Sequence, residues 1–181
     1  VGAVALLVWN SHFWEKGAVA ATIDGVDYKA ADLQYYYSQV RNSEIQMAQY
    51  YAYYGIPATF DATVSDGEQW YSESDGKTYA DYFREQALTS LQQTAVACKA
   101  AQEAGYTLSE AGEKELQENL SSFDKYAAQS NMTRGAYISY LYGGEVTEKV
   151  LTRNLRNDIL ADEYRQYYQD SQTYEDADLE T

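Results

Sequence analysis

The sequence has 181 residues, the length of one domain, and 45% of them are hydrophobic, which argues against a disordered chain. Acidic residues outnumber basic ones by 28 to 13, and the net charge of −15 disfavours binding to nucleic acid or to anionic lipid headgroups. Cys98 is the only cysteine and His12 the only histidine, so neither an intrachain disulfide nor a usual zinc site can form. We therefore expect no catalytic residue, metal or cofactor in this chain.

The chain opens with an apolar run of nine residues, Val1–Trp9, about half the length needed to cross a bilayer. Trp14 and Lys16 follow, and such residues favour a membrane–water interface. We interpret residues 1–17 as the remnant of a membrane anchor with its juxtamembrane segment. A short buried strand or helix of the domain itself is the alternative.

Residues 18–29 have the pattern of a tight β-hairpin. Asp24 and Gly25 supply the positive φ angles of a two-residue turn, and short apolar runs flank them. Because a lone two-stranded hairpin is only marginally stable, we expect it to pack on the helix that follows.

That helix is predicted over residues 30–54, where one face repeats at spacings of four and three. The face consists of Leu33, Tyr37, Val40, Glu44, Met47, Tyr51 and Tyr54. Gly55 and Pro57 end the helix. Residues 56–77 show no sustained periodicity, and a loop of this length is either functional or partly disordered. Within it, Trp70 and Tyr71 are the side chains that we expect to attach the loop to the body.

Four further helices are predicted, over residues 79–103, from the N-cap Ser109 onward, over 133–142 and over 146–170. Residues 172–181 hold four acids and no base, which is typical of an acidic tail or linker. The fold class is therefore mainly α, an irregular helical bundle with a short N-terminal β-hairpin, and the domain spans residues 18–171.

Tyrosine is over-represented, with 20 Tyr against 4 Phe and 3 Trp. Many occur in runs, and neighbours on a helix point about 100° apart, so a run cannot be wholly buried on one face. Exposed tyrosines offer a large apolar area that tolerates water, which suits a binding surface. Packing at the rim of the helical layers is the alternative. The residues predicted to be exposed and to bind a client are Tyr36, Tyr50, Tyr53, Tyr140 and Tyr142.

Residues 19–33, VAATIDGVDYKAADL, resemble the start of the SurA and PrsA type of bacterial foldases, in which a hairpin with an Asp-Gly or Asn-Gly turn leads into a long helix. The segments YTLSE (106–110), MTRGAY (132–137) and LTRNLRNDIL (151–160) follow in a similar order. The resemblance covers residues 18–170 and rests on pattern and element order, without an invariant catalytic signature. The 56–77 loop is longer than in that family, and no lipoprotein-type cysteine lies near the N-terminus.

The resemblance implies a SurA N-terminal-like lobe that binds unfolded polypeptide outside the cytoplasm, on a chain held at the membrane by an N-terminal anchor. The family is that of peptidyl-prolyl isomerases, but its parvulin domain carries a histidine and none follows His12. We therefore expect a chaperone lobe without isomerase activity, whose partners are unfolded or extended secreted polypeptides. The alternative is a cell-surface interaction module that binds one folded partner or self-associates.

Overall fold

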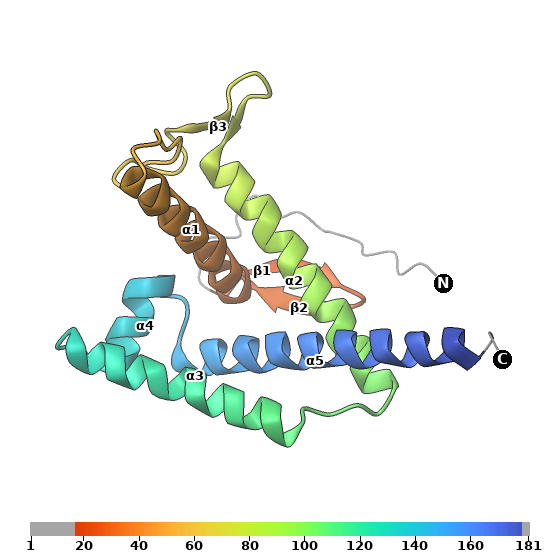
Figure 1. Cartoon of the computed structure of the whole chain (residues 1–181). Coiled ribbons are helices and arrows are strands. Elements are labelled where there is room, and N and C mark those ends of the chain that lie inside the picture. Colours follow the sequence, from red (N-terminus) through yellow and green to blue (C-terminus); the bar gives the residue numbers. More distant parts are fainter. Residues whose placement is uncertain (1–16, 179–181) are drawn as a thin grey trace. The chain divides into compact units, whose positions relative to one another are not determined.

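The computed structural model describes residues 17–178, with side chains as far as residue 172. The predicted fold class is confirmed, because this part of the chain is mainly helical with a short β-hairpin near its start (Figure 1). The predicted anchor lies outside it, except for residue 17. The described elements are β1 (Val19–Ile23), β2 (Val26–Lys29), α1 (Ala30–Tyr53), β3 (Trp70–Ser72), β4 (Lys77–Thr78), α2 (Tyr79–Glu103), α3 (Glu110–Gln129), α4 (Arg134–Tyr142) and α5 (Glu148–Asp178).

The chain divides into two compact units. The first consists of the residues up to Leu91 together with Leu141–Glu145, and the second of Gln92–Tyr140 and the residues from Val146 onward. Helix α2 therefore begins in the first unit and ends in the second. The domain predicted over residues 18–171 contains parts of both units.

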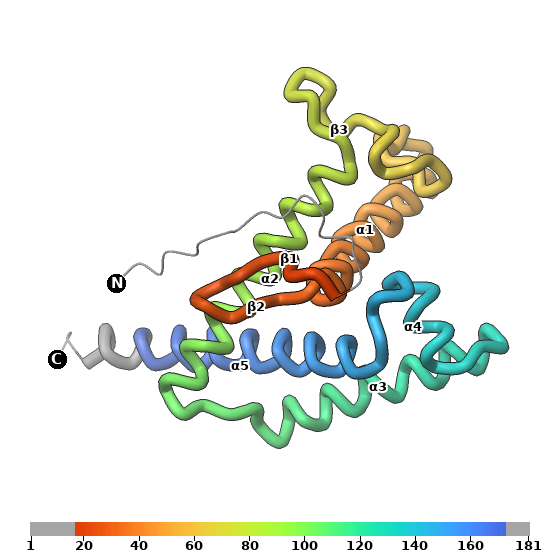
Figure 2. Tube along the Cα trace, turned by 180° about the vertical axis from the view of Figure 1, so that it is seen from behind, coloured from red at the N-terminus to blue at the C-terminus, as the bar shows by residue number. Residues whose placement is uncertain are grey.

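In the first unit, the N-terminal hairpin forms as predicted. Asp24 and Gly25 have φ angles of 50° and 79°, the positive values that a type I′ turn needs at both central positions. The strands pair antiparallel, with Ile23 opposite Val26. The backbone N–H of Ala30 donates to the carbonyl of Ala18 at 2.9 Å, which ties the base of the hairpin to the first residue of α1. Figure 2 shows β2 leading directly into this helix.

Helix α1 ends where the sequence predicted, with Gly55 at a φ of 69° just beyond its last turn. Its predicted buried face is only half correct. Leu33 and Tyr37 are buried, but Met47, Tyr51 and Tyr54 are exposed. All buried residues of α1 lie between positions 30 and 38, so the C-terminal half of the helix extends beyond the elements that cover its first half.

The 56–77 segment is structured, because it contains the β3–β4 hairpin and a buried anchor, Phe60. The ring of Phe60 packs against Tyr79 and Phe83 of α2, with centroids 4.8 and 5.3 Å apart. Tyr71 lies flat on Tyr82 at 4.0 Å, so this tyrosine attaches the loop as predicted, although Tyr71 and Trp70 are both exposed.

In the second unit, α3 runs alongside α5 in both views (Figures 1 and 2). The predicted N-cap is confirmed, because the Ser109 hydroxyl accepts a hydrogen bond from the backbone N–H of Gly112 at 3.0 Å. Leu116 and Leu151 are fully buried in this unit. Helix α5 continues to Asp178, over most of the segment predicted as an acidic tail. The chain has no glycine or proline after Gly144 that would end the helix earlier.

Candidate functional site

Four tyrosines form an exposed group at the C-terminal end of α1, and we call Tyr50, Tyr51, Tyr53 and Tyr54 the tyrosine cluster. All four are exposed, and Tyr53 keeps 83% of its surface accessible. Met47 on the preceding turn and Ile56 just after the helix are exposed too. A group of exposed apolar side chains of this kind is typical of an interaction surface.

The spacing of the four tyrosines along the helix builds the cluster. Residues four apart share one face, and the rings of Tyr50 and Tyr54 lie with centroids 4.8 Å apart. The ring of Tyr53 meets that of Tyr54 edge to face, at 5.1 Å and 87°. Because the rings contact one another, they lose less side-chain freedom on binding a ligand than isolated tyrosines would. The cluster is therefore a partly pre-organised surface on a rigid helix end.

A polar contact holds the loop that follows the cluster against α1. Asp66 accepts hydrogen bonds from Nε of Arg41 at 2.9 and 3.0 Å and from the hydroxyl of Tyr37 at 2.8 Å. Burial raises the pKa of the Tyr37 hydroxyl well above its usual range, and the bond to Asp66 raises it further. Tyr37 is therefore a neutral hydrogen-bond donor at any physiological pH, and the carboxylate of Asp66 is its acceptor.

The loop carries a second local hydrogen-bond group, at Asp61. The hydroxyl and backbone N–H of Thr63 donate to Asp61 Oδ1 at 2.7 and 2.9 Å, and these bonds lower the pKa of the Asp61 carboxyl. Asp61 therefore remains negatively charged at physiological pH on the exposed surface of the loop.

The structure confirms the exposure of three of the five tyrosines predicted to bind a client. Tyr50 and Tyr53 lie together in the tyrosine cluster. Tyr140 is 72% exposed on α4 of the second unit, where its ring stacks on Tyr137. The prediction for Tyr36 is wrong, because this ring is only 3% exposed. Tyr36 belongs to the first turns of α1, where the helix is covered on several sides.

Tyr142 is half-buried, and its ring lies parallel to that of Tyr35 at 5.5 Å. The hydroxyl of Ser38 donates to the backbone carbonyl of Tyr142 at 3.1 Å. These contacts attach the last residue of α4 to α1 within the first unit, so Tyr142 has a packing role in addition to any exposed surface.

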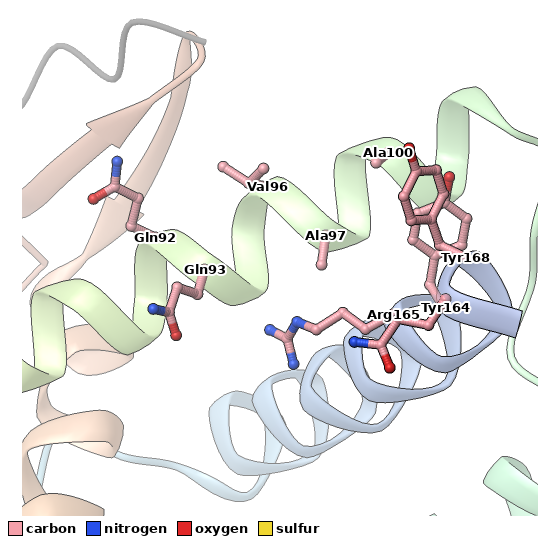
Figure 3. A pocket seen from close by; sticks show the side chains of 9 residues that line it. Gln92, Gln93, Val96, Ala97, Ala100, Tyr164, Arg165 and Tyr168 are labelled. Atoms are coloured by element: carbon pink, nitrogen blue, oxygen red, sulfur yellow. The ribbon is translucent and has the colours of Figure 1, made fainter. Parts of the chain in front are cut away.

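A groove that the sequence did not predict lies in the second unit, between α2 and α5. Its volume is about 470 Å³. Val96, Ala97 and Ala100 of α2 form an apolar wall, and Tyr164 and Tyr168 of α5 close one end (Figure 3). The two tyrosines are four residues apart in a helix, a spacing that places them on one face and is the sequence signal for this end of the groove. The remaining lining residues are Gln92, Gln93, Arg165 and Gln169.

Cys98 lines a second, smaller cavity of the same unit, of about 350 Å³. Its thiol donates to the carbonyl of Asn157 at 3.3 Å. Burial raises the pKa of Cys98 to about 11, and the nearby carboxylate of Asp158 adds to the shift. The reactive thiolate is therefore scarce at neutral pH, as expected of a packing cysteine rather than a nucleophile.

Comparison with known protein families, with curated proteins and with solved structures finds no significant match to this chain. Between residues 17 and 178, no helix is both long and apolar enough to span a membrane. The same part of the chain contains no group of three or more side chains placed to hold a metal ion.

Proposed function

We propose that this chain is a chaperone-like lobe that binds unfolded or extended polypeptide through the tyrosine cluster. The exposure of these rings at the end of α1 is the observation that carries the proposal. Tyrosine rings contact many different side chains and also tolerate water, so a surface made of them suits a binder of diverse segments. The groove between α2 and α5 offers a second apolar surface for the same purpose.

The cellular setting belongs to the same proposal and is supported by the sequence resemblance. We place this lobe outside the cytoplasm, anchored at the bacterial cell envelope, with secreted polypeptides as clients, as in the SurA and PrsA type of foldases. Binding of this kind needs no covalent chemistry, because many weak contacts to an extended chain are sufficient.

The test is protection from aggregation, measured by light scattering on several unrelated denatured proteins. The wild-type chain should slow aggregation of most of them, and the double variant Tyr50→Ser/Tyr53→Ser should lose most of that protection. Its free energy of unfolding should fall by no more than about 0.5 kcal/mol per substitution, because both rings are exposed.

The matched control is Tyr126→Ser, which removes an exposed tyrosine from α3 in the second unit. This variant should protect as well as the wild type. Protection of no denatured protein, together with tight binding to one folded partner or to a second copy, would instead identify an interaction module.

A further inference from the structure

The tyrosine cluster lies in a stretch of chain without positive charge. Between Arg41 and Lys77 the sequence contains no lysine, arginine or histidine, whereas it contains the six acids Glu44, Asp61, Asp66, Glu68, Glu73 and Asp75. Of these, Asp66 is paired with Arg41. The surface of this segment therefore carries a negative field, and that field favours ligands of positive charge.

The two basic residues that bracket this stretch have partners outside the cluster. Arg41 is hydrogen-bonded to Asp66, and its guanidinium lies 5.6 Å from the ring centre of Phe60. The ammonium of Lys77 contacts Glu85 and lies 5.6 Å from the ring centre of Tyr71. These contacts show that the unit already pairs its own cations with aromatic rings.

The geometry of the cluster suits a cation as well. The face of an aromatic ring is negative, and a lysine or arginine head group is attracted to it at up to about 6 Å from the centroid. Tyr53 and Tyr54 stand at 87° to each other, and Tyr50 is tilted at 55° to Tyr54. Rings at these angles present faces in different directions, so a flexible cationic side chain can reach one face from several approaches.

The end of α1 adds to the same effect. A helix C-terminus carries a partial negative charge, which basic side chains in the last turn commonly offset. Helix α1 has no basic residue in its last turn. The tyrosine cluster is therefore built around a negative helix end that no nearby side chain of that turn neutralises.

From these observations we infer that the tyrosine cluster selects extended segments that carry lysine or arginine, and that it binds their side chains against the tyrosine faces. The inference rests on the proposed function and names the class of client segment. Apolar contact supplies binding to any extended chain, and the negative field with the ring faces supplies the preference for cations.

The test compares two fluorescein-labelled extended peptides that differ only in the replacement of arginine by citrulline, which has nearly the same shape without the charge. Fluorescence polarisation measures Kd for both with the wild-type chain at low and at high salt. We expect the arginine peptide to bind about five-fold tighter than the citrulline peptide at low salt, because about two exposed cation–π contacts would account for that ratio of Kd values. The preference should shrink at high salt, because salt screens the field.

The decisive variant is Tyr50→Leu/Tyr53→Leu, which keeps apolar surface but removes two ring faces, with Tyr126→Leu as the control. The double variant should lose most of the preference for the arginine peptide, because two ring faces are gone while the negative field remains, and the control should keep the five-fold preference. Equal binding of both peptides to the wild type would overturn this inference and leave the proposed function standing. An unchanged preference in the double variant would overturn it too. Binding of neither peptide to the wild type would overturn the proposed function as well.

Discussion

Replacing Asp66 by alanine should destabilise the chain more than the replacement of any other polar side chain in the 56–77 loop. The carboxylate of Asp66 is the acceptor that joins this loop to two side chains of α1, Arg41 and Tyr37. Without it, the half-buried guanidinium loses an ion pair and the hydroxyl of Tyr37 loses its bond to the carboxylate.

The size of the effect follows from these contacts. A hydrogen bond to a charged group contributes roughly 1.5–3 kcal/mol to stability. The side chain of Asp66 is only 14% exposed but that of Arg41 is 29% exposed, so solvent weakens the ion pair. Together the contacts of Asp66 should contribute about 3 kcal/mol. Asp66→Asn keeps an oxygen for the Tyr37 hydroxyl but loses the charge, and should cost about half as much.

Urea unfolding followed by circular dichroism measures this loss. A change of about 3 kcal/mol should move the midpoint by about 1–2 M urea for a protein of this size. The matched control is Glu68→Ala, an exposed acid of the same loop, which should change stability by no more than about 0.5 kcal/mol. A double-mutant cycle with Tyr37→Phe should give a coupling energy of about 1 kcal/mol.

Unfolding of Asp66→Ala and Glu68→Ala at the same urea concentration would contradict a stabilising role for the contacts of Asp66. A cycle without coupling to Tyr37 would show that the hydrogen bond from the Tyr37 hydroxyl to Asp66 contributes nothing to stability.

Three further predictions concern the second unit. Gly112→Ala should destabilise the fold by about 1–3 kcal/mol, because a Cβ there would lie 2.6 Å from Oε1 of Glu163. Gly135→Ala should be neutral or should stabilise the fold by up to about 1 kcal/mol, because its Cβ would meet nothing closer than 3.6 Å. Thermal unfolding of both variants checks the sign of each change. Cys98 should react with iodoacetamide at pH 8 at least about ten-fold more slowly in the folded than in the urea-unfolded chain, because its pKa is raised to about 11 in the fold. Because the pKa of Cys98 is higher in the fold than in the unfolded chain, the protonated thiol stabilises the folded state. This contribution is complete below the unfolded thiol pKa of about 8.5 and should be lost as the pH rises from about 8.5 to 11. A Cys98→Ala variant should therefore lose less stability over that range. Equal alkylation rates in the two states would contradict the burial of the thiol.

Much of the candidate site could be predicted from the sequence, because its signals are local. The exposure of Tyr50 and Tyr53 follows from the run of tyrosines, because neighbouring residues of a helix point in different directions and cannot all lie on one buried face. The end of α1 follows from Gly55. The exposure of Tyr51 and Tyr54 could not be predicted in this way, because a periodic face indicates which residues share a side and not whether another element covers that side.

The sequence by itself determined the elements whose ends depend on neighbouring residues. The Asp24–Gly25 turn, the full extent of α2 and the Ser109 cap of α3 all formed as predicted, because turn and cap energies depend on residues only a few positions apart.

The tertiary structure alone decided which faces are buried. Tyr36 is buried while Tyr53 is exposed on the same helix. The groove between α2 and α5 is lined by both Val96 and Tyr168, which are more than 70 positions apart in the chain. Burial depends on which elements pack together over such separations, and that packing releases water from apolar surface wherever the layers meet. The packing of the elements also decides that the end of α1 stays uncovered, and the tyrosine cluster therefore lies at the surface.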